Sequence, residues 1–135
     1  MTILYTDGSC IGNSEKDYDS RTIAYAVSDS QGKILIEKKE NGGSNNIAEL
    51  KAIVEALLWA KKNKIGEVEI RTDSKIAINW IYAKKFGKHL NNKELVIGIR
   101  RLIDDVRGKI KVNFIWVPRE INLAGHYFEN VCTSR

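Results

Sequence analysis

The hydrophobic residues of this chain change their period along the sequence, and this change restricts the possible folds more than any other feature. Three runs rich in β-forming residues come first, at 2–6, 21–28 and 33–40. The last two are separated by Asp29-Ser30-Gln31-Gly32, a turn cluster that predicts a hairpin. Apolar residues then recur at helical spacing over about 46–63, which predicts an amphipathic helix.

The second half of the chain alternates between strand and helix patterns. Residues 68–72 alternate as a strand that stops at Asp73, and residues 110–116 alternate as a last strand. Helical spacing marks three further segments, at about 76–81, 95–106 and 124–131. The order βββ-α-β-α-α-β-α predicts an α/β fold with a five-stranded mixed sheet, in which three antiparallel strands precede two helix-connected strands and helices flank the sheet.

Composition narrows the class of protein further. With 43% hydrophobic and 29% charged residues over 135 positions, the chain is too apolar for disorder and too charged for a membrane protein. We expect a single domain over 1–135, no membrane partner and a monomer. Two cysteines without zinc-type spacing, Cys10 and Cys132, exclude zinc and disulfide frameworks and favour a cytoplasmic location. The net charge of +5 weakly suggests a polyanionic partner.

Three carboxylates stand where a catalytic site would need them. Asp7 and Asp73 each follow a Thr at a predicted strand end, and Glu49 lies in the first turn of the helix after the hairpin. If the three carboxylates converge, they would repel one another unless divalent cations lay among them. Mg²⁺ is the favoured cation, because it prefers oxygen ligands and suits phosphate chemistry. Each residue also has a purely structural interpretation. Asp73 could cap a helix, Glu49 could form a capping box with Asn46, and Asp7 could be a turn residue.

Four segments, in this order, are similar to the type 1 ribonuclease H family. They are Tyr5-Thr6-Asp7-Gly8-Ser9-Cys10, Ser44-Asn45-Asn46-Ile47-Ala48-Glu49-Leu50-Lys51-Ala52, Thr72-Asp73-Ser74 and Trp116-Val117-Pro118-Arg119-Glu120-Ile121-Asn122. The resemblance runs nearly end to end, and its Asn-Asn-x-Ala-Glu-Leu block is the most specific part. It implies the ribonuclease H-like fold and a metal-dependent endonuclease that cuts the RNA strand of RNA·DNA hybrids with two Mg²⁺ ions, or possible Mn²⁺.

The resemblance also implies roles for particular residues. Asp7, Glu49 and Asp73 match the first three metal-binding carboxylates of the family. Asn45 and Asn46 match the pair that contacts nucleotides in the minor groove. Cys10, Asn13 and Lys75 fall near further positions that contact nucleic acid in the family. A minor-groove contact would suit an RNA-selective enzyme, because the 2′-hydroxyls are displayed there.

The sequence departs from the family at the fourth metal ligand. The family pattern places an Asp four residues after Asn122, where this chain has His126. Helical spacing puts Glu129 on the same polar stripe, so either residue could supply the fourth group. Glu129 is the better oxygen ligand for Mg²⁺, whereas His126 is in register and suits Mn²⁺ better. His126 could also be an ordinary surface histidine.

A second departure lies between the two middle helices, where many relatives carry an extra basic helix. The segment 83–92 is too short for one, yet it holds Lys84, Lys85 and Lys88, with Trp80 nearby. It predicts either a reduced phosphate-contacting loop or a solvated loop. Trp59 and Trp116 fall in apolar patterns, and we expect them in the core.

Two other functions compete with the nuclease. A changed fourth ligand could leave a hybrid- or RNA-binding domain with weak or no catalysis. A resolvase-like nuclease could share the fold, although the Asn45–Asn46 pair favours a hybrid reader. Fold alone does not separate these functions.

Overall fold

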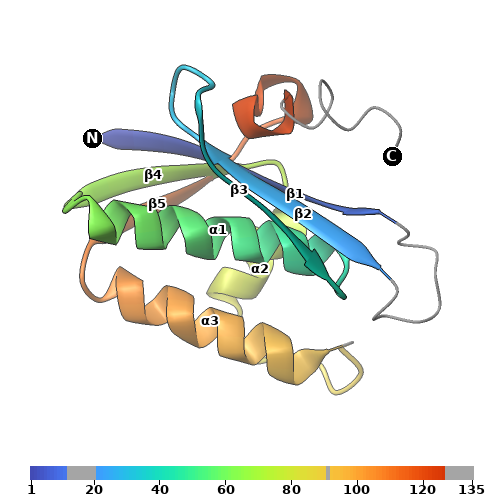
Figure 1. Ribbon diagram of the computed structural model, residues 1–135. Helices are drawn as coiled ribbons and strands as arrows, with labels where there is room; N and C mark the ends of the chain where they lie inside the picture. Colours follow the sequence, from blue (N-terminus) through green and yellow to red (C-terminus); the bar gives the residue numbers. More distant parts are fainter. Residues whose placement is uncertain (12–20, 91, 127–135) are drawn as a thin grey trace.

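Five strands form one mixed sheet in the computed structural model, which describes residues 1–11, 21–90 and 92–126 (Figure 1). The strands are β1 (Thr2–Ile11), β2 (Thr22–Ser28), β3 (Ile34–Asn41), β4 (Glu67–Thr72) and β5 (Lys111–Trp116). Their order in the sheet is β3-β2-β1-β4-β5. The first three pair antiparallel, and β1–β4 and β4–β5 pair parallel, which confirms the predicted mixed sheet.

Three helices cover one face of this sheet: α1 (Asn45–Lys62), α2 (Lys75–Tyr82) and α3 (Lys93–Arg107) (Figure 1). Helix α1 packs on β1 and β2, and α3 packs against α1. The segment after β5 crosses to the opposite face, where it forms a 3₁₀ turn over Arg119–Ile121 and a helical turn over 123–126. No helix among the described residues is long and apolar enough to cross a membrane.

The main hydrophobic core lies between the sheet and the helices. Leu4, Ile53, Leu57 and Ile70 are fully buried there, and burying a side chain of this size contributes roughly 1.5–3 kcal/mol. A smaller cluster on the other face joins Tyr5 to residues of the segment after β5, Val117 and Ala124. The adjacent β1 residues Leu4 and Tyr5 belong to different clusters, because side chains along a strand alternate between the two faces of the sheet.

The largest difference from the sequence prediction is the length of the first strand. The β pattern stops at residue 6, but β1 continues to Ile11 because it stays paired with β2 as far as Ile11↔Thr22. The prediction that Asp7 stands at a strand end is therefore wrong, because Asp7 lies inside β1, opposite Ala26. Its pairing with β4 does end there, since the last parallel pair is Thr6↔Thr72.

Candidate active site

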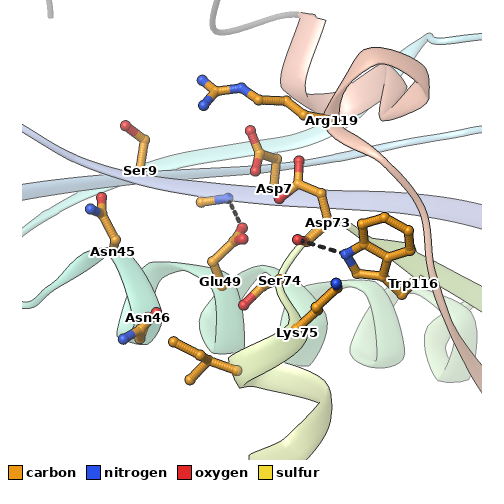
Figure 2. A pocket seen from close by; sticks show the side chains of 12 residues that line it. Asp7, Ser9, Asn45, Asn46, Glu49, Asp73, Ser74, Lys75, Trp116 and Arg119 are labelled. Atoms are coloured by element: carbon orange, nitrogen blue, oxygen red, sulfur yellow. Dashed lines mark hydrogen bonds between the residues drawn. The ribbon is translucent and has the colours of Figure 1, made fainter.

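The parallel pairing of β1 and β4 brings two aspartates side by side. Asp7 and Asp73 each follow directly after the last residue pair of this ladder, Thr6↔Thr72. Because parallel strands point the same way, the two carboxylates emerge at the same edge of the β1–β4 ladder. Figure 2 shows their side chains pointing toward each other. The Thr-Asp repeat of the sequence is thus a structural equivalence between neighbouring strands.

The third carboxylate reaches this edge because Gly8 lets α1 approach β1 closely. A Cβ atom at Gly8 would lie 2.3 Å from the Ala48 carbonyl carbon and 2.5 Å from the Glu49 nitrogen. In return, the Glu49 carboxylate accepts a hydrogen bond from the Gly8 backbone N–H. The absence of a side chain at Gly8 therefore sets the position of Glu49 relative to Asp7.

The purely structural interpretations of the three carboxylates are not what the structure shows. Ser74, not Asp73, caps α2, since its Oγ accepts from the Ala77 N–H at 3.0 Å. Ser44, not Asn46, caps α1, accepting from the Ile47 N–H at 3.3 Å, so Glu49 takes no part in a capping box. Neither the Asp73 nor the Glu49 carboxylate is used as a helix cap.

The three carboxylates form a tight and largely buried cluster. One ligand oxygen from each of Asp7, Glu49 and Asp73 lies within 4.8 Å of the others. Asp7 and Glu49 are only 8% and 7% exposed. Burial, and then the negative charge of Asp73, raise the pKa of Asp7 from 3.8 to about 6. Burial, followed by the charges of Asp7 and Asp73, raises the pKa of Glu49 well above its usual value.

This arrangement fits a divalent cation. Oxygen-only ligands at such spacing are those that Mg²⁺ prefers, and a cation would relieve the repulsion that raises the pKa of Asp7. The donor set holds no sulfur or imidazole, so a site for a softer metal is not favoured.

A buried amide supports one side of the cluster. Asn122 is fully buried and donates to Asp73 Oδ2 at 3.1 Å and to the Thr6 carbonyl at 2.9 Å. Its Oδ1 accepts from the N–H of Ala124 at 3.1 Å, at the start of the next helical turn. In the sequence Asn122 marks only the spacing to the expected fourth ligand, and its own role becomes visible only when Thr6 and Asp73 lie beside it.

The carboxylates lie in an open cavity of about 480 Å³. Three of the predicted nucleic-acid-binding residues also line it: Asn45, Asn46 and Lys75. Figure 2 shows Asn45 and Asn46 on one side of the carboxylates and Lys75 on the other. The Asn45 Oδ1 accepts a hydrogen bond from the Cys10 N–H at 2.7 Å, which holds that amide in place. Cys10 thus contributes its backbone N–H to the site, while its thiol donates to the Gly43 carbonyl at 3.9 Å.

His126 is engaged with its own loop. Its Nε2 lies 2.7 Å from the Glu120 carbonyl oxygen, which can only accept, so this nitrogen carries the proton. His126 is not among the residues that line the cavity, nor in the carboxylate cluster. The preceding residue, Gly125, does lie close to the carboxylate cluster, because a Cβ atom there would lie 3.1 Å from Asp7 Oδ2. Glu129 and Asn13 lie outside the described residues.

The predicted basic loop lies away from the cavity lining. Lys84, Lys85 and Lys88 are exposed between α2 and α3 and are not among the lining residues. Trp80 is half-buried against the core, and its carbonyl accepts from Arg100 at 3.0 Å. The contact of these four residues with nucleic acid remains a prediction.

Trp116 and Arg119 line the cavity, although neither was predicted as a site residue. Trp116 was expected in the core with Trp59; Trp59 does pack partly buried against the core, but Trp116 is 44% exposed and lines the cavity. The correction has a simple cause: Trp116 is the last residue of β5 and pairs with Thr72, so it stands beside Asp73 at the same sheet edge. Arg119 follows in the crossing segment, and its positive charge acts to lower the pKa of Asp7.

Comparison with known proteins gives consistent results. The family model described as RNase H matches residues 1–126. The chain is 29% identical over 140 residues to a ribonuclease H of Actinobacillus pleuropneumoniae, covering 96% of this chain and 83% of that enzyme. The fold is similar to RNase H1 of Halobacterium salinarum, with a TM-score of 0.70, 20% identity and coverage of 99% and 98%. It is also similar to LC11-RNase H1 in complex with an RNA/DNA hybrid, with a TM-score of 0.61, 28% identity and coverage of 90% and 88%.

Proposed function

The chain belongs to the ribonuclease H family, and from that premise we propose that it is an endonuclease hydrolysing the RNA strand of RNA·DNA hybrids. The observation that carries the proposal is the meeting of two groups of residues in one cavity. Three clustered carboxylates suited to a divalent metal, two of them buried, lie beside the Asn45–Asn46 pair, which is suited to reading nucleotides. The relative LC11-RNase H1, whose structure contains an RNA/DNA hybrid, supports this substrate class.

We assign the metal-holding role to the three clustered carboxylates. Asp7 stands on β1, the central strand of the sheet, and together with Glu49 and Asp73 it would hold the metal ions. Two Mg²⁺ ions, or Mn²⁺, supply at such a site an activated water and charge stabilisation for the leaving oxygen of a phosphodiester. The chain itself contributes rigidity, because Gly8 holds Glu49 and Asn122 holds Asp73.

Hybrid selectivity would come from the asparagine side of the cavity. The bond from the Cys10 N–H occupies Asn45 Oδ1, which leaves the amide NH₂ as the donor toward a ligand. A 2′-hydroxyl can both accept and donate such bonds, and it is present only on RNA. Asn45 and Asn46 would therefore distinguish the strand to be cut.

A second candidate function is a hybrid-binding domain with weak catalysis. One observation favours it: the position of the family's fourth ligand holds His126, whose Nε2 is already bonded to the Glu120 carbonyl. In this case the cavity would bind hybrid without cutting it at a useful rate.

A cleavage assay separates the two functions. The full chain is incubated with a labelled RNA·DNA hybrid, double-stranded RNA and single-stranded RNA, in Mg²⁺ and in Mn²⁺. We expect the RNA of the hybrid alone to be cut, and Asp7→Asn to abolish the cutting. Asp104→Asn is the matched control, since Asp104 lies exposed on α3 in ion pairs with arginines. Hybrid binding without cleavage in either metal would contradict the nuclease and support the binding domain.

A further inference from the structure

Lys75 and Trp116 form a pair at the edge of the cavity that the proposed function does not yet use. The Lys75 Nζ lies 4.7 Å from the centre of the Trp116 ring, in cation–π contact. Both residues line the cavity that holds the carboxylates, and Figure 2 shows them together on the Asp73 side.

Trp116 is held through both its side chain and its backbone. Its Nε1–H donates to the Asp73 carbonyl at 3.1 Å. Its backbone is held by pairing with Thr72, and the next residue, Val117, donates its N–H to the Thr72 carbonyl at 2.9 Å. These bonds place the Trp116 ring beside Asp73, although the side chain is 44% exposed.

The charge of Lys75 is not neutralised within the described residues. The lysines with ion pairs, Lys38, Lys51, Lys109 and Lys111, all face carboxylates elsewhere on the surface. No carboxylate of the described residues is within ion-pair distance of Lys75, which instead lies over the ring. A cation–π contact orients an ammonium without cancelling its charge, so the group stays available to an anion.

We propose that Lys75 binds a backbone phosphate of the nucleic acid, and that Trp116 is the positioning residue that holds its ammonium for this purpose. The inference rests on the proposed function, because it takes the RNA·DNA hybrid as the ligand. Lysine is a compact charge with three donors, which suits a phosphate oxygen more than a base edge. Because the Trp116 indole also donates to the Asp73 backbone carbonyl, a phosphate bound by Lys75 is placed beside the carboxylate cluster.

The salt dependence of hybrid binding tests this inference without cleavage. Binding of the full chain to a fluorescein-labelled RNA·DNA hybrid is followed by anisotropy in a chelator, at several KCl concentrations. Each phosphate contact contributes about 0.7–0.9 to the slope of log K against log salt. We expect Lys75→Met to reduce the slope by about that amount and Lys75→Arg to retain it. Lys111→Met is the matched control, since Lys111 starts β5 at the end opposite Trp116 and pairs with Glu67.

A double variant tests the positioning role. Trp116→Leu alone should weaken binding and reduce the slope, whereas in the Lys75→Met background it should change neither quantity, because Trp116 acts through Lys75. Affinity lost at Trp116 with an unchanged slope would overturn the proposal in favour of a base stacked on the ring. Circular dichroism confirms folding, and if Trp116→Leu does not fold, the Lys75 variants still decide the phosphate contact.

The outcomes for this inference and for the nuclease are separable. Hybrid cleavage by the unmodified chain together with an unchanged slope in Lys75→Met would overturn the phosphate contact alone. A reduced slope without any cleavage would overturn the nuclease and leave the phosphate contact supported.

Discussion

The side-chain amide of Asn122 donates a hydrogen bond to Asp73 Oδ2 at 3.1 Å, joining residues 49 positions apart in the chain. The same amide donates to the Thr6 carbonyl, and its oxygen starts the helical turn that follows. One buried side chain thus connects β1, the edge of β4 and the crossing segment. Asp73 follows directly after β4, and Asn122 holds its carboxylate in place.

Replacement of Asn122 should reduce stability markedly. Asn122→Ala leaves the buried Thr6 carbonyl without this donor and removes a helix cap, so we expect the free energy of unfolding to fall by about 2–4 kcal/mol. Asn122→Asp keeps an acceptor for the cap but loses both donor hydrogens and places a second carboxylate against Asp73, so we expect it to destabilise the protein as well. Urea unfolding measures both variants. Asn63→Ala is the control, because the exposed Asn63 also bonds a carbonyl yet should change stability by less than about 0.5 kcal/mol.

Two glycines should respond to alanine with opposite signs. Gly8→Ala would force β1 and the α1 backbone apart, since the new Cβ would lie 2.3 Å from the Ala48 carbonyl carbon. We expect a loss of about 1–3 kcal/mol or more, together with lost hybrid cleavage as Glu49 moves. Gly98→Ala meets nothing within 4 Å inside α3 and should gain about 0.5–1 kcal/mol. Equal effects at both sites in thermal unfolding would contradict the close approach at Gly8.

The carboxylate cluster should make stability fall as pH rises when no metal is present. The pKa of Asp7 is raised from 3.8 to about 6 in the folded protein, so between these values the folded state binds more protons than the unfolded state. The free energy of unfolding then decreases through this range, and the raised pKa of Glu49 adds to the decrease. Unfolding in chelator at a series of pH values measures it. Asp7→Asn should flatten the profile, and a profile that rises over this range would contradict the prediction.

A divalent metal should reverse this effect at neutral pH. An ion that binds the folded carboxylates alone stabilises the protein by about 2.7 kcal/mol at a hundred times its Kd. We therefore expect the melting temperature to rise with Mg²⁺ in the unmodified chain and not in Asp7→Asn. Asp105→Asn is a control, because that carboxylate lies exposed on α3, paired with Lys109. A magnesium response that survives Asp7→Asn would place the metal elsewhere.

His126 should contribute less to cleavage than the three carboxylates. Its Nε2 is occupied by the Glu120 carbonyl, so His126→Ala should change kcat by less than about tenfold, or 1.4 kcal/mol. His126→Asp restores an oxygen ligand in register and should raise the rate in Mg²⁺. Steady-state cleavage of the hybrid in Mg²⁺ and Mn²⁺ checks both variants. A loss at His126→Ala as large as that of Asp7→Asn would make His126 a metal ligand.

The order of elements and the mixed character of the sheet could be predicted from the sequence, because hydrophobic period is a local property. The pairing of β1 with β4 comes from the tertiary structure, since it joins strands far apart in the chain. The three carboxylates and the Asn45–Asn46 pair also stood out, since short motifs mark them. The length of β1 could not be predicted, because residues 7–11 are polar or small and become strand only through pairing with β2.

The same distinction applies to the site. A period of two placed Trp116 with Phe114 as core, but the pattern does not show where the covering helices end. Phe114 is buried under them, whereas Trp116 at the strand end is exposed beside Asp73. Likewise, Asn122 and Gly8 carry no signal of their contacts, since those contacts lie 49 and 41 residues away along the chain. Local spacing in the sequence indicates which residues could bind a metal or nucleic acid, and long-range packing determines which of them meet.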